Sequence, residues 1–157
     1  MGSPPQHLVT SYMTWYACGM RLVLDTDVLV AALRSATGAS RRILLAGIDQ
    51  RCTLLISPVL MFEYEAVLKR PAHLHSAGAS EADVEVVLDM LAAAAERVEL
   101  HYLWRPQLTD VGDEMVLETA VNGRADALVT FNTRHFVPAA TRFGLTVVRP
   151  GDIVGRI

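Results

Sequence analysis

The sequence predicts a single α/β domain in which helices cover both sides of a central, mainly parallel sheet of about four or five strands. Two observations lead to this fold class. Short apolar runs alternate with segments of helical periodicity, an order typical of parallel strands joined by crossover helices. The 157 residues are also 52% hydrophobic with a mean hydropathy of +0.30, a high value that suits strands buried on both faces.

The first half of the chain alternates strand, helix, strand and helix. Residues 21–25, RLVLD, are expected to form a short strand, and residues 38–48, GASRRILLAGI, a helix whose apolar residues fall on one side. Residues 52–57, CTLLIS, follow as a second strand. The serine and proline that come next provide an N-cap and a first turn for a helix that runs to about Arg70 and stops before Pro71.

The second half continues this alternation. A helix is expected over residues 80–95, because its valines and leucines recur at helical spacing. RVEL at 97–100 is a third strand, and 112–122 is a helix that closes at a glycine. DALVTF at 126–131 and LTVVRP at 145–150 complete the sheet.

Residues 1–19 are expected to be an extension to a domain that spans residues 20–157. The extension lacks the positive start and long apolar core of a signal peptide. No stretch approaches the roughly 18 charge-free apolar residues of a membrane span, so no membrane partner is expected. Cys18 and Cys52 are too few for a disulfide scaffold, and a reduced cytoplasm is the simplest compartment.

The formal net charge of −3 excludes a strongly basic nucleic-acid binder, so any such binding must come from a local patch. Lys69 is the only lysine. Phosphate contacts would therefore come from arginines, whose planar guanidinium groups bind phosphate through two parallel hydrogen bonds.

Two carboxylates, Asp25 and Asp27, directly follow the first apolar strand. A buried unpaired charge is costly, so the pair needs a partner, an exit into solvent or a cation. Ligands of parallel sheets bind at the carboxyl ends of the strands, which is where Asp25 is expected. Asp27 follows in the turn toward the next helix, and a plain loop or capping role remains open for both residues.

The helix after the second strand carries two glutamates with different surroundings. Glu63 shares the apolar side of the helix by the three-and-four rule, whereas Glu65 lies four residues before Lys69 and is expected to form a surface ion pair. A core-facing glutamate has either an arginine partner or a place in a site. Glu63 is therefore the candidate site residue.

The helix over 112–122 supplies a further acid. Asp113 heads its apolar side in the first turn, where the helix dipole favours a carboxylate. Asp110 is a candidate N-cap, Glu114 and Glu118 are expected to face outward, and Asp126 to be structural. Asp25, Glu63 and Asp113 thus come from three elements and predict a magnesium or manganese site, because hard cations take oxygen ligands.

Four segments in this order resemble the PIN-domain ribonucleases, and within them the VapC-like toxins of bacterial toxin–antitoxin systems. They are LDTDVLVAAL, SPVLMFEYEAVLKRP, LTDVGDEMVLETAVNGRADALVTFNTRHF and LTVVRPGDIV. The resemblance covers about Met20 to the C-terminus. It implies a three-layer PIN-like sandwich, a magnesium-dependent endoribonuclease acting on RNA, a homodimer and an antitoxin protein as partner.

By position, the resemblance implies the metal ligands Asp25, Glu63, Asp113 and, in an assisting role, Asp110. Asn132 occupies a fourth position where many relatives carry aspartate, and its amide oxygen could ligate a cation without adding charge. Asp27 replaces the asparagine usual at its position and adds an acid near the site.

An RNA substrate would need cationic contacts near the carboxylates. Candidates after the first strand and after Asn132 are Arg34, Arg41, Arg42 and Arg134. An ordinary solvated helix surface is equally compatible with these arginines.

Two other functions stay open. Asn132 permits a PIN domain that binds RNA or a protein partner without cutting. DTDVLV also resembles the aspartate pair of haloacid-dehalogenase-like phosphatases, but that class needs a lysine near the phosphate, and Lys69 is expected on the opposite side of its helix from Glu63.

Overall fold

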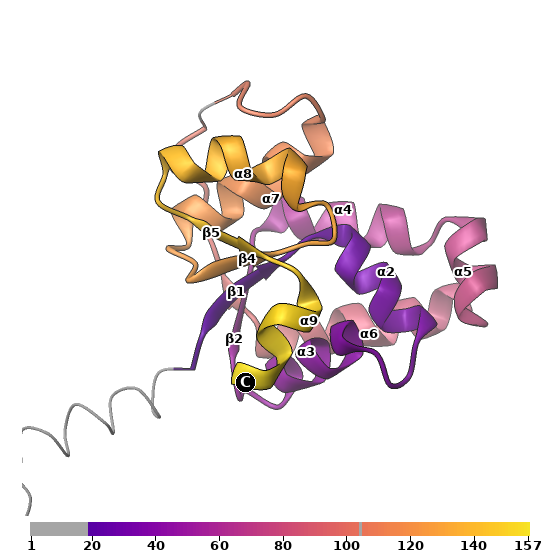
Figure 1. Cartoon of the computed structure of the whole chain (residues 1–157). Coiled ribbons are helices and arrows are strands. Elements are labelled where there is room, and N and C mark those ends of the chain that lie inside the picture. The colour runs from indigo at the N-terminus through magenta and orange to yellow at the C-terminus, as the bar shows by residue number, and fades with distance from the viewer. Residues whose placement is uncertain (1–18, 104) are drawn as a thin grey trace, which may run out of the picture.

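The computed structural model describes residues 19–103 and 105–157 and is built around a five-stranded, fully parallel sheet (Figure 1). The strand order β3-β2-β1-β4-β5 confirms the predicted fold class. The strands are β1 (Arg21–Leu24), β2 (Thr53–Ile56), β3 (Glu96–Arg97), β4 (Ala127–Val129) and β5 (Thr146–Val148). The predicted extension falls on residues that, apart from Gly19, lie outside the described part of the chain.

Helices cover the sheet on both sides, with α7 and α8 on one side and α3 and α9 on the other (Figure 1). The helices are α2 (Thr26–Arg34), α3 (Ala39–Ile48), α4 (Pro58–Leu68), α5 (Pro71–Ala77), α6 (Glu81–Ala94), α7 (Val111–Asn122), α8 (Thr133–Arg142) and α9 (Pro150–Ile153), followed by a 3-10 turn at Val154–Arg156. Within the described residues, no helix is both long and apolar enough to cross a membrane.

The central strand β1 explains the high hydropathy of the chain. It pairs with β2 on one side and with β4 on the other, with Leu22 opposite Leu54 and Val23 opposite Leu128. Leu22, Val23 and Leu128 are fully buried. A strand enclosed by two neighbours and two helical layers must be apolar on both faces, as the sequence predicted.

The chain leaves β1 and β4 toward opposite sides of the sheet. β1 continues into α2 and α3, whereas β4 continues into α8, on the opposite side from α3 (Figure 1). Because neighbouring strands whose connections diverge leave a crevice beyond their carboxyl ends, this fold creates a ligand-binding position between β1 and β4.

The structure confirms the helix starts that the sequence predicted at Ser57 and Ser80. Ser57 caps α4 by accepting a hydrogen bond from Leu60 N, and Ser80 forms a capping box at the start of α6. Four helices, α2, α5, α8 and α9, were not predicted from the sequence. Strand β3 begins one residue earlier than expected and is shorter. Asp27 consequently lies in the first turn of α2 and not in a turn before a helix.

Gly47 of α3 packs directly on Leu54 of β2. A Cβ atom at position 47 would lie 2.3 Å from Leu54 Cδ1 and 2.4 Å from its Cγ, and Leu54 is itself buried. We expect Gly47→Ala to lower the free energy of unfolding by about 1–3 kcal/mol, despite the better helix propensity of alanine. Urea denaturation measures the change.

Gly151→Ala in α9 is the matched control, because no atom lies within 4 Å of a Cβ at that position. Its stability should equal or slightly exceed that of the wild type. Wild-type stability in Gly47→Ala would contradict the close packing of α3 on β2.

Candidate active site

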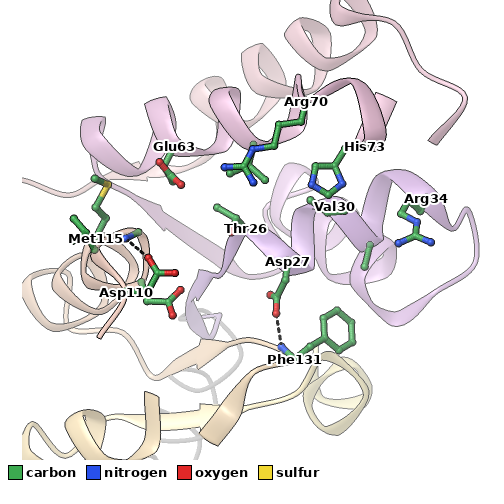
Figure 2. Close-up of a pocket in the computed structure, with 15 residues that line it drawn as sticks. Thr26, Asp27, Val30, Arg34, Glu63, Arg70, His73, Asp110, Met115 and Phe131 are labelled. Carbon is green, nitrogen blue, oxygen red and sulfur yellow. Dashed lines mark hydrogen bonds between the residues drawn. The ribbon is translucent and has the colours of Figure 1, made fainter. Parts of the chain in front are cut away.

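A pocket of about 720 Å³ opens beyond the carboxyl ends of β1 and β4, between α2, α4 and the start of α7 (Figure 2). Its lining includes four carboxylates, Asp27, Glu63, Asp110 and Asp113. The pocket therefore occupies the crevice that the diverging connections of β1 and β4 create.

Asp25 is 4% exposed and lies behind the pocket lining, where hydrogen bonds from Thr26 and Thr130 hold its carboxylate. Oδ1 accepts a bond of 2.7 Å from Thr26 N, which makes Asp25 the N-cap of α2, and Oδ2 accepts a bond of 2.7 Å from the Thr130 hydroxyl. Burial raises the pKa of Asp25, while the hydrogen bonds from Thr130 and Thr26 oppose this shift. The strand end is held in turn by Tyr64 of α4, whose hydroxyl donates to the Leu24 carbonyl.

Asp27 faces the pocket from the first turn of α2. Its Oδ2 accepts a hydrogen bond of 3.1 Å from Phe131 N, whereas its Oδ1 is buried and has no hydrogen-bond partner among the described residues. Burial and then the charge of Asp25 raise the pKa of Asp27 to about 7. Asp27 is thus a pocket acid with one buried oxygen that lacks a hydrogen-bond partner among the described residues.

Glu63 and Asp110 meet around Gly112. A Cβ atom at position 112 would lie 3.3 Å from Asp110 Oδ1 and 3.4 Å from Glu63 Oε1. Asp110 caps α7 by accepting a bond of 2.8 Å from Gly112 N, as the sequence predicted. The glycine leaves the space in which the carboxylates of α4 and α7 approach each other (Figure 2).

Asp113 lies in the first turn of α7, and its Oδ2 is 3.5 Å from His135 Nδ1. Burial raises the pKa of Asp113, and the charges of Asp25 and Asp110 act in the same direction. Asp113 is therefore close enough to the N-caps of α2 and α7, Asp25 and Asp110, for their charges to act on it.

The chemistry of this donor set fits a hard divalent cation, because it consists of carboxylate oxygens and includes an unpartnered buried one. In the arrangement described for residues 19–103 and 105–157, no three His, Cys, Asp or Glu side chains are grouped so that they could hold one ion. Binding an ion would therefore require carboxylates to rotate inward. Asn132 precedes α8, is exposed and does not line the pocket.

The candidate arginines lie in four different surroundings. Arg34 lines the pocket. Arg41 donates from Nε to the Ala32 carbonyl, which ties α3 to the end of α2. Arg42 lines a separate hollow beside the C-terminus, and Arg134 is exposed on α8 outside the pocket lining.

Several residues of the pocket lining were not predicted as site residues, and Arg70, His73 and Phe131 are the cationic and aromatic side chains among them. Arg70 and His73 enter from the corner between α4 and α5, and Phe131 enters from the residues after β4 (Figure 2). Helical periodicity carries no information about a corner between two helices. A proline directly after Arg70 was the only sequence indication of that corner.

Glu114 and Glu118 are buried, which corrects the expectation that they face outward. Glu118 binds Arg105 through two bonds of 2.6 and 3.0 Å, and Glu114 Oε1 accepts from the backbone N–H groups of Gln107 and Leu108. The segment 105–108 folds over α7 and supplies these partners. Asp126 is structural as expected, since it accepts a bond from Arg21 N.

The fold and the pocket define a class: a small α/β protein with an acidic site at the switch point of a parallel sheet. The family model of the PIN domain matches residues 21–134, a range that includes Asp25, Glu63 and Asp113. The chain belongs to the PIN domain family.

Among solved structures, the chain is similar to one described as the crystal structure of VapBC2 from Rickettsia felis bound to a DNA fragment from their promoter. The match has a TM-score of 0.57 and 18% sequence identity, and it covers 83% of this chain and 98% of that chain. At this identity the likeness shows a shared fold. No curated protein matches the sequence.

The raised pKa values predict how stability depends on pH. Asp27 has a pKa of about 7 in the folded state and an ordinary value near 3.8 when unfolded, so the folded state binds more protons between these values. The free energy of unfolding should therefore fall as pH rises from about 4 to about 7, by on the order of 1–2 kcal/mol after solvent screening. Thermal unfolding in chelator measures this loss.

Asp27→Asn should reduce this pH dependence, because it removes a carboxyl group whose pKa is raised to about 7 in the folded state. Asp83 and Glu96, whose pKa values are lowered by Ser80 and Arg21, act in the opposite direction. Their stabilising effect is lost as the pH falls through their ordinary values, so neither can produce a loss of stability as the pH rises. An Asp27→Asn variant with the wild-type pH profile would contradict the role given to Asp27.

Proposed function

We propose that this protein is a metal-dependent endoribonuclease that hydrolyses RNA phosphodiester bonds and acts as the toxin of a toxin–antitoxin pair. One observation carries the proposal: carboxylates from α2, α4 and α7 line one pocket at the sheet switch point, with the buried Asp25 next to them. Membership of the PIN domain family and the fold shared with VapBC2 support it.

Asp25, Glu63 and Asp113 would hold a magnesium or manganese ion, with Asp110 and Asp27 beside them. A divalent cation, when bound, neutralises charge at the phosphodiester and makes water more acidic. Thr26 and Thr130 fix the orientation of the Asp25 carboxylate through their hydrogen bonds. His135 Nδ1 lies 3.5 Å from Asp113 Oδ2 and would exchange a proton with that acid.

A second candidate function is RNA binding without cleavage, and one observation favours it. No three candidate ligands are grouped for an ion among the described residues, so an inward rotation of carboxylates is required for catalysis. The phosphatase alternative loses its lysine, because Lys69 Nζ binds Glu65 at 2.8 Å and Glu85 at 2.9 Å and does not line the pocket.

The proposal includes a homodimer, an antitoxin partner and a cytoplasmic location. Phe62 of α4 is 71% exposed beside an apolar hollow of about 320 Å³ between α4 and α6, where Met61 and Ala92 also lie. Apolar surface of this kind favours a protein–protein contact. The buried Cys52 thiol, whose pKa is raised by burial, suits a reducing compartment.

Glu63→Gln should reduce magnesium-dependent RNA cleavage by about 100-fold or more, because even partners of metal ligands contribute about 10–100-fold. Glu65→Gln, two residues away on the same helix, should cleave at the wild-type rate, because Glu65 belongs to the ion pair with Lys69. Magnesium titration and cleavage of a labelled RNA are measured on the same samples.

Equal activity of Glu63→Gln and wild type would contradict the site, as would cleavage that persists in chelator. Magnesium and RNA binding without any cleavage by the wild type would establish the second candidate function instead.

Phe62→Glu should convert the protein to a monomer, since it places a charge in the proposed apolar contact. Light scattering should give about twice the 17.2 kDa chain mass for the wild type and the single-chain mass for the variant. Val137→Glu on α8, also exposed and outside that hollow, is the control and should keep the wild-type mass. A wild-type monomer would contradict the homodimer.

A further inference from the structure

The pocket has two chemically different ends. Glu63 and Asp110 face each other at one end, whereas Arg34, His73 and Phe131 gather at the other (Figure 2). Arg70 projects between the two ends, and Asp27 also lies there, bonded to Phe131 N. A cation explains the acidic end but leaves the arginines and the phenylalanine without a role. The second end therefore has a chemistry of its own.

Arg34 and Arg70 are not used to hold the fold together. Within the described residues, neither guanidinium group has a recorded hydrogen bond or ion pair, and both residues are exposed. Arg41 and Arg105, by contrast, are bound to backbone carbonyls and to Glu118. Two unpaired guanidinium groups on one pocket suit phosphate oxygens, which they bind through parallel hydrogen bonds.

Phe131 offers an exposed aromatic face at the same end. Its side chain is among the large apolar groups that stay exposed, at 48%, although the next aromatic residue, Phe136, is fully buried. Its backbone is held firmly: Phe131 N donates to Asp27 Oδ2, and Thr130 before it bonds to Asp25. The ring is thus presented to the pocket from an anchored backbone.

We propose that Phe131, Arg34 and Arg70 form a subsite for one unpaired nucleotide of RNA, with its base stacked on Phe131 and its phosphates against the two arginines. The subsite rests on the proposed ribonuclease function and assigns to it the residues that would hold the nucleotide. A base in a duplex is stacked between its neighbours and cannot lie on a protein ring, whereas unpaired bases stack on aromatic side chains. The subsite therefore selects single-stranded segments and sets the RNA beside the acidic end.

The test measures binding separately from cleavage. A labelled, unstructured RNA of about 12 nucleotides is titrated with the full chain in EDTA, so that no strand is cut, over about 50–200 mM salt. Phe131→Leu should weaken binding about tenfold without changing the salt dependence, and Phe131→Tyr should restore it. Arg34→Gln and Arg70→Gln should each lower the slope of log K against log salt by about 0.7.

Arg42→Gln is the matched control, because Arg42 is an exposed arginine that lines a different hollow. It should keep the wild-type affinity and salt slope. Thermal unfolding of each variant verifies the fold, which matters for Arg34 because it lies in the last turn of α2, where a positive charge is favourable. The same RNA annealed to its complement should bind at least about tenfold more weakly than the single strand.

The outcomes separate this subsite from the proposed function. Equal RNA affinity of wild type and Phe131→Leu, or equal affinity for single strand and duplex, overturns the subsite even if magnesium-dependent cleavage is found. The expected binding pattern in a protein that never cleaves RNA supports the subsite and overturns the ribonuclease.

Discussion

The Thr130 hydroxyl is the contact on which the arrangement of the site depends. It donates to Asp25 Oδ2 at 2.7 Å, lies 3.3 Å from Asp27 Oδ2 and accepts a bond of 3.0 Å from Asn132 N. A hydroxyl has one hydrogen to donate, so it cannot satisfy both carboxylates at once. The end of β4 is thereby joined to the end of β1 and the start of α2, while Asp27 keeps a buried oxygen, Oδ1, without a hydrogen-bond partner in the described part of the chain.

Concentrating acids in this way opposes the stability of the fold. Burial raises the pKa values of Asp25, Asp27 and Asp113, and the charge of Asp25 raises those of Asp27 and Asp113 further. The ionised site is therefore less favourable than the same ionised acids in the unfolded chain. The fully buried apolar residues of β1 and β4 offset this cost directly beneath the acids. The apolar sheet thus contributes stability that the acidic site opposes.

The sequence predicted the sheet and most of its acids because both follow from local patterns. Alternating strands and helices specify a parallel sheet, and helical periodicity placed Glu63 toward the pocket and Glu65 in the ion pair with Lys69. It failed for Glu114 and Glu118, because α7 is covered by the sheet on one side and by segment 105–108 on the other. An interpretation by helical periodicity assumes that a helix has one buried side. The second side of α7 is covered by a segment outside the helix, and the periodicity of the helix itself does not predict this contact.

The same limit explains why one end of the pocket was expected and the other was not. An acid that follows a buried strand conflicts with its surroundings and is conspicuous in a sequence, whereas an exposed arginine or phenylalanine near a helix end agrees with a solvated surface. Arg70 and Phe131 differ from ordinary surface residues only through the pocket that they share. Asn132 illustrates the reverse case: the family pattern marks its position, yet it is exposed outside the pocket lining, and Asp27 of α2 contributes the additional carboxylate there. The number of carboxylates that line the pocket therefore depends on where α2 begins, one residue after Asp25, because this places Asp27 in the lining. It does not depend on Asn132.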